Sequence, residues 1–217
     1  MQLSWSNHSS IPWRRFMAIV VGAVVVVTPL GCAYRGVGMV ASAAAYTSPK
    51  PASLLFSSDT LTMPGPASKA VTYNRELAPI GAAMTVAVTP SSEGVTRAEF
   101  AVSGLLPNRG YAVHAHTKAC GATADAAGPH FQNRIDPAAT PQAPSSNPEY
   151  ANPSNEIWLD VRTDATGAGT SRTTVPFVLT DRAPGSIVVH EAMQTATDPG
   201  QAGKAGARLA CLTLAGR

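Results

Sequence analysis

From residue 69 onward the sequence consists of short runs in which apolar and polar side chains alternate, separated by Gly, Pro and Asn. In the run 82–88 (AAMTVAV), Met84, Val86 and Val88 share one face. The same period of two recurs in 96–104, 156–162, 170–179, 185–193 and 207–214. Such runs predict antiparallel β-strands, and no segment of useful length has a helical period.

The fold class follows from the number of these runs. Seven or eight antiparallel strands predict an all-β domain, either an immunoglobulin-like β-sandwich or a closed Greek-key β-barrel. The composition is that of a globular chain, since 45% of the residues are hydrophobic and 13% are charged. Two long loops, 117–155 and 191–207, interrupt the strands, and long loops on a compact β scaffold usually carry function.

The charge balance excludes nucleic acid as a partner. The net charge is +3, but residues 1–31 hold Arg14 and Arg15 and no acid. The remainder therefore has 14 basic and 13 acidic residues. No basic patch interleaved with aromatic residues occurs, so nucleic-acid binding is not expected.

Residues 1–32 have the pattern of an export signal. A basic pair precedes the apolar run 16–27, which is shorter than the roughly 20 residues of a membrane span. The stretch TPLGC resembles a bacterial lipobox and predicts a lipid anchor at Cys32; cleavage near 41–45 (ASAAA) is the alternative. We expect an extracytoplasmic protein, either a membrane-anchored lipoprotein or a periplasmic or cell-wall protein.

The part of the chain after the signal divides at residue 68. Residues 33–68 are rich in Ala, Ser and Pro and predict a flexible tether, or alternatively a loosely packed arm, before the domain 69–217. In an exported chain, Cys120 and Cys211 would most simply form one disulfide, with two buried thiols as the alternative. The disulfide would close a loop of about 90 residues.

Four of the five histidines adjoin the two long loops, and His8 lies in the predicted signal. His114 and His116 are two apart on a strand and therefore project from the same face. His130 lies in GPHF, and His190 ends an apolar strand. A histidine pair alone is weak evidence of a metal site, but four neutral imidazoles suit a divalent copper or zinc ion.

Four segments in order identify a resemblance to the copper/zinc superoxide dismutase family: GLLPNRGYAVHAH, GPHF, GSIVVHE and GARLAC. The resemblance covers residues 68–217 and implies an eight-stranded Greek-key β-barrel. It also implies copper ligands, one intrasubunit disulfide, and two catalytic residues at Arg208, which attracts and orients superoxide, and His130. The implied copper ligands are His114, His116, His130 and His190, and the implied disulfide joins Cys120 to Cys211.

The sequence departs from the family where zinc would bind. The family's zinc takes the bridging histidine, here His130, with two further histidines and an aspartate from the following loop. Residues 131–160 hold no histidine or cysteine, and Gln194 stands where the family has an aspartate linking the two metal sites. These differences resemble the copper-only branch of the family, so zinc is expected to be absent.

Without zinc, His130 needs another partner for its second nitrogen. We expect a carboxylate in this role, with Glu156 as the first candidate and Asp160 as the second, because both lie where the loop rejoins the barrel. The alternative is that Glu156 is a solvated residue at the start of a strand.

The expected function is that of an exported copper-dependent superoxide dismutase that acts on superoxide. The alternative is a copper-binding or carrier module with little turnover. Arg208 discriminates between the two functions, because a protein that only holds copper needs no cation near the metal. The alternative role of Arg208 is that of a structural ion-pair partner. Lys204 would add to the positive field, whereas Glu191 and Asp198 would weaken it. Family members occur as monomers and as dimers, so a homodimer is one expected state.

Overall fold

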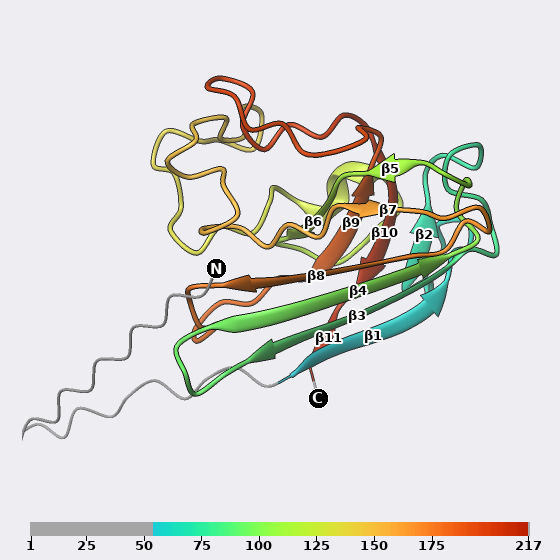
Figure 1. Ribbon diagram of the computed structural model, residues 1–217, viewed down its shortest axis with the longest axis horizontal. Coiled ribbons are helices and arrows are strands. Elements are labelled where there is room, and N and C mark those ends of the chain that lie inside the picture. Colours follow the sequence, from blue (N-terminus) through green and yellow to red (C-terminus); the bar gives the residue numbers. More distant parts are fainter. Residues whose placement is uncertain (1–53, 217) are drawn as a thin grey trace, which may run out of the picture. The chain divides into compact units, whose positions relative to one another are not determined.

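The structure is a computed structural model that describes residues 54–216 (Figure 1). The predicted export signal 1–32, with its lipidation site Cys32, and residues 33–53 of the predicted tether lie outside the described residues. Within 54–216, no helix is long and apolar enough to cross a membrane.

Two antiparallel sheets form the body of the fold, and a two-stranded sheet of β5 and β7 adjoins them. The first sheet has the order β11 (Ala215–Gly216), β1 (Leu55–Thr60), β3 (Ala83–Pro90), β4 (Thr96–Ser103) and β8 (Gly169–Val175). The second has the order β2 (Ala70–Thr72), β10 (Arg208–Thr213), β9 (Ser186–His190) and β6 (Val113–His116). The short elements are β5 (Gly110–Tyr111), β7 (Val161–Arg162) and the 3₁₀-helix η1 (Ala124–Ala127).

Of the strands in the described residues, eight have three residues or more. This confirms the predicted all-β, Greek-key type of fold.

The first sheet has one buried face, as its alternating sequence predicts. In β3, Met84, Val86 and Val88 are fully buried, and their neighbours in the strand are partly or fully exposed. Val86 pairs with Phe100 of β4, so these two strands present their apolar side chains to one core.

The second sheet is buried on both faces, and this positions the candidate site. Every residue of β6 and β9 is buried. Ile187 and Val189 face the main core, whereas Val188 belongs to a smaller cluster with Cys211 on the other side of the sheet. The long loops 117–155 and 191–207 lie together at one end of the fold (Figure 1).

Two sequence predictions need correction. Residues 55–60, predicted as tether, form β1, which pairs with β3 along its whole length. Only Leu55 and Ser57 of β1 are buried, and Ser57 is polar. The sequence of this strand therefore has no alternation of apolar and polar residues that would predict a strand. The run 156–162 has the predicted inward side chains, yet only its last two residues form a ladder, as β7.

Candidate metal centre

Three of the four candidate histidines are carried by the second sheet. His114 and His116 lie two apart on β6, with Val113 and Ala115 directed to the main core from the opposite face. His190 is the last residue of β9, the neighbouring strand. All three imidazoles are buried.

The fourth histidine comes from the loop and meets the other three. His130 forms an isolated β-bridge with His116, which brings the loop backbone against the edge strand β6. One ligand nitrogen from each of the four histidines lies within 4.8 Å of the others. Among the described residues, this is the single cluster of three or more His, Cys, Asp or Glu side chains with such geometry.

The inward nitrogens are close enough to share a proton or to bind one cation between them. His114 Nδ1 lies 3.0 Å from His130 Nε2, and His116 Nε2 lies 3.2 Å from His190 Nε2. Nitrogen lone pairs that face each other at this distance repel. A metal that prefers imidazole nitrogen would fit this donor set.

The buried imidazoles remain neutral at neutral pH and can therefore act as ligands. Burial, and then the positive charge that neighbouring imidazoles would carry, holds the pKa of His114 and His116 well below the ordinary value. Burial also lowers the pKa of His190 to about 3, with a further contribution from His130. Protons are thus weak competitors for a metal at these three side chains.

The outward nitrogen of each imidazole has its own hydrogen-bond partner, which fixes ring orientation and tautomer. His116 Nδ1 donates to the carbonyl oxygen of Gly128 at 2.9 Å, and His190 Nδ1 lies 3.4 Å from that of Gly206. These bonds leave Nε2 of both rings directed at the shared centre.

Glu156 is the partner of His130. Its Oε2 lies 2.9 Å from His130 Nδ1 and also accepts from Trp158 Nε1 at 2.7 Å. Gln132 Nε2 donates to the other carboxylate oxygen at 2.8 Å. The side chain is buried rather than solvated, so the structure does not support the alternative of a strand-entry residue in solvent.

Arg208 lies beside the histidines at the start of β10. Its guanidinium donates to the carbonyl oxygens of Ala124 at 2.9 Å and Gly128 at 2.8 Å, and Asp125 Oδ1 is 3.8 Å away. Gly128 O therefore accepts from both Arg208 and His116. The arginine is mostly buried, yet it reaches a cavity next to the metal centre.

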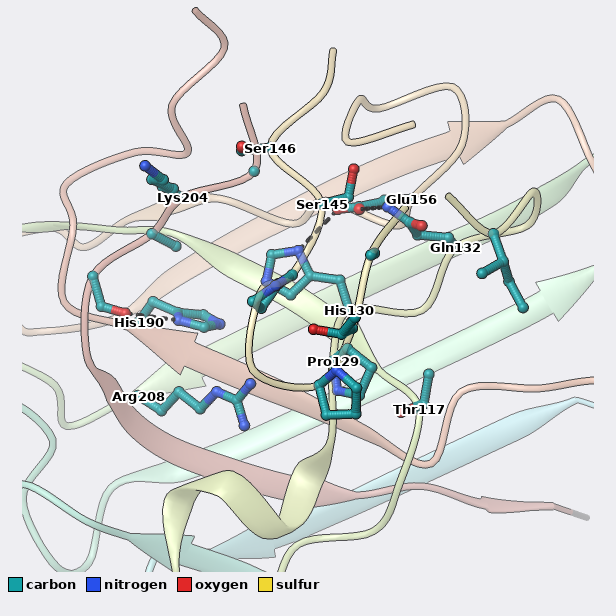
Figure 2. A pocket seen from close by; sticks show the side chains of 18 of the residues that line it. Thr117, Pro129, His130, Gln132, Ser145, Ser146, Glu156, His190, Lys204 and Arg208 are labelled. Carbon is teal, nitrogen blue, oxygen red and sulfur yellow. Dashed lines mark hydrogen bonds and ion pairs between the residues drawn. The ribbon is translucent and has the colours of Figure 1, made fainter. Parts of the chain in front are cut away.

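This cavity has a volume of about 460 Å³ and opens onto the histidine cluster. Figure 2 shows His130 in its middle, with His190, Arg208 and Lys204 along one side. Glu156 is the single carboxylate in its lining, and it is committed to its three donors. The other charged side chains of the lining, Arg182, Lys204 and Arg208, are cationic, a balance that suits an anionic ligand.

Comparison with known proteins decides the family. Residues 82–213 match the family model described as copper/zinc superoxide dismutase (SODC). The chain belongs to this family. No curated protein matches it. The solved structure described as "Crystal Structure Analysis of the clock protein EA4" is 17% identical over 79% of this chain and 99% of that chain, with a TM-score of 0.48.

The intrasubunit disulfide expected of a superoxide dismutase is present. Cys120 and Cys211 are bonded, with their Cα atoms 5.7 Å apart, so the alternative of two buried thiols is wrong. The bond attaches the start of the 117–155 loop to β10, the strand that begins at Arg208. It thereby holds η1 against that strand, where Arg208 donates to the carbonyl oxygens of Ala124 in η1 and of Gly128 directly after it.

The partner of His114 was not foreseen from the sequence. His114 Nε2 lies 2.5 Å from Thr195 Oγ1, and Thr195 in turn binds Asp160. Asp160 was the second candidate to support His130, but it lies on the side of His114 instead. Gln194, at the position of the family's aspartate, is exposed. A threonine in a loop rich in Ala and Gly gives no spacing signal that would reveal this role.

Proposed function

We propose that the chain is an exported, copper-dependent superoxide dismutase that works without zinc. Superoxide is the substrate of its family. The observation that carries the proposal is the convergence of four imidazole nitrogens beside a cavity that Arg208 lines. Nitrogen ligands suit divalent copper, and a cation beside the ligands suits a small anion.

The residues have separable tasks. His114, His116, His130 and His190 would hold copper. Copper bound there would supply alternating one-electron oxidation and reduction of two superoxide anions, giving oxygen and hydrogen peroxide with uptake of two protons.

Arg208 would attract and orient the anion, and its two hydrogen bonds to backbone carbonyls keep the guanidinium beside the cavity. Lys204 would add to the field from the other loop, although its ammonium also binds Gln201.

The surroundings of His130 support function without zinc. In the family, the second nitrogen of the bridging histidine faces zinc. Here the Nδ1 atom of His130 is 2.9 Å from a buried carboxylate that also binds Gln132 and Trp158. Glu156 would thus orient the ring, as the zinc ion does in other members.

The proposed location is outside the cytoplasm. A disulfide between Cys120 and Cys211 suits an oxidising compartment, and residues 1–32 have the pattern of an export signal. A lipid anchor at Cys32 and a homodimer remain predictions.

A copper carrier with little turnover is the second candidate. Both amino groups of the Arg208 guanidinium bind backbone carbonyls, which gives the arginine a structural use in the absence of catalysis. The two functions differ in whether the positive charge at Arg208 affects the reaction.

Arg208→Gln and Arg208→Lys separate these functions. In copper-loaded full-length protein we expect Arg208→Gln to slow superoxide decay by about tenfold or more and to flatten its dependence on salt. Arg208→Lys should retain more of the rate, and copper content should not change. Arg172→Gln, which removes an exposed arginine on β8, is the matched control. Equal rates for all variants would favour the carrier.

A further inference from the structure

Thr195 and Asp160 form a hydrogen-bonded relay to the outward nitrogen of His114. His114 Nε2 and Thr195 Oγ1 are 2.5 Å apart, and Thr195 Oγ1 lies 2.7 Å from Asp160 Oδ1. The backbone N–H of Thr195 donates to Asp160 Oδ2 at 2.7 Å. Direct contact between the carboxylate and His114 is minor, since their nearest atoms are 3.9 Å apart.

The donors and acceptors in this relay allow one arrangement of protons. An ionised carboxylate only accepts, so the Thr195 hydroxyl must donate to Asp160. Its oxygen then accepts from His114, which places the imidazole proton on Nε2. Nδ1, the nitrogen that faces His130 at 3.0 Å, is left with a lone pair. The relay therefore selects the tautomer that can bind a metal at the shared centre.

Asp160 also ties three separate segments together. Besides Thr195 in the 191–207 loop, it accepts from the backbone N–H of Val113 at 3.0 Å, directly before His114 in β6. The carboxylate is about one-third exposed, whereas His114 and Thr195 are buried. The neutral Thr195 hydroxyl thus contacts the buried His114 ring, and the charged carboxylate of Asp160 remains partly in contact with solvent. This arrangement lowers the desolvation cost of the carboxylate.

We infer that Thr195 and Asp160 are positioning residues that fix His114 as a ligand and thereby tune the copper it would hold. This inference deepens the proposed function. A hydrogen bond from a ligating imidazole to an outer acceptor makes the imidazole a stronger donor, and loss of such a partner typically costs 10–100-fold in metal affinity. A stronger donor favours the divalent ion over the monovalent one, so the relay should lower the reduction potential.

The test compares Thr195→Val, Thr195→Ser and Asp160→Asn in the full chain, with Thr197→Val, an exposed threonine of the same loop, as control. Thr195→Val should weaken Cu(II) binding by 10–100-fold. If Cu(I) binding does not change, the reduction potential should rise by about 59 mV for each tenfold loss. The electron paramagnetic resonance spectrum of Cu(II) should also change in Thr195→Val. Thr195→Ser should restore all three properties, and Asp160→Asn should fall between the wild type and Thr195→Val.

An unchanged potential and spectrum in both Thr195→Val and Asp160→Asn would overturn the inference, as would failure of Thr195→Ser to rescue. Copper binding without superoxide turnover would remove the proposed activity and leave this test intact. Nitrogen NMR of the metal-free protein adds a readout that needs no copper. It should show His114 protonated at Nε2 in the wild type, and a mixture of tautomers in the wild type would contradict the relay.

Discussion

The strand half and the loop half of the metal centre are built by different means. The strand half is His114 and His116 on β6 with His190 on β9, all buried by pairing of the second sheet. The loop half is His130 with its partner Glu156, and the His130 side chain is 19% exposed. Packing of the sheet fixes the first group, whereas a carboxylate, one β-bridge and a nearby disulfide fix the second.

The loop half of the site can change more freely than the strand half. The strand half cannot vary without disturbing β6 and β9, whose opposite faces form the main core. The loop half requires only a partner that holds His130 Nδ1 in place, either a hydrogen-bond acceptor or a metal ion. The buried carboxylate of Glu156 is such a partner, and it contacts His130 without a change in β6 or β9. The two halves should therefore respond to different perturbations.

The largest expected effect comes from loss of the disulfide, which restrains the loop half. The Cys120–Cys211 bond spans 91 residues, and the chain-entropy model gives about 4–5 kcal/mol for a loop of this length. The double variant Cys120→Ser, Cys211→Ser should lose stability of this order in urea unfolding. Reductant should destabilise the wild type and leave the variant unchanged. An equal response of both proteins would contradict the assignment.

Acid should act on the strand half of the metal-free protein. The pKa of His114, His116 and His190 is lowered in the folded state, so only the unfolded state gains protons as the pH falls below 6.5. Each group then costs about 1.4 kcal/mol per pH unit. Three groups cost on the order of 4 kcal/mol between pH 7.5 and 5.5.

Urea unfolding at these two pH values measures the loss. His190→Gln should reduce the pH effect by about one-third, because one of the three groups no longer titrates. Constant stability across this range would show that the three imidazoles are not buried as described.

A smaller effect is expected at Glu156, in the loop half. Glu156→Gln keeps the shape but replaces an acceptor oxygen with a donor, which leaves one buried N–H without a partner. We expect a loss of about 1–3 kcal/mol in stability and a 10–100-fold loss in copper affinity. Glu149→Gln, at an exposed carboxylate paired with Arg134, is the control. Unchanged copper affinity in Glu156→Gln would mean that His130 needs no carboxylate.

The sequence predicts the strand half better than the loop half, for a physical reason. A period of two fixes which side chains share a face, so Met84, Val86 and Val88 were correctly placed in the core and His114 beside His116. The same rule found the buried side chains of 156–162 but not the break in strand pairing there, because periodicity reports burial and not backbone partners.

Contacts between loops leave no such period. Thr195 reaches His114 across 81 positions, and Asp160 reaches Thr195 across 35. Neither pair has a fixed spacing, and a threonine hydroxyl is common in any loop. Strand β1 was missed for a related reason, because its pattern of burial ends after Ser57.

Function of the copper site without zinc is tested most directly by metal analysis combined with measurement of superoxide decay. Metal-free full-length protein is loaded with copper alone, with zinc alone, or with both. We expect one copper per chain in the samples that received copper, negligible zinc in every sample, and catalysed superoxide decay in the sample that received copper alone. Stoichiometric zinc at full occupancy, or superoxide decay that requires zinc, would contradict this expectation.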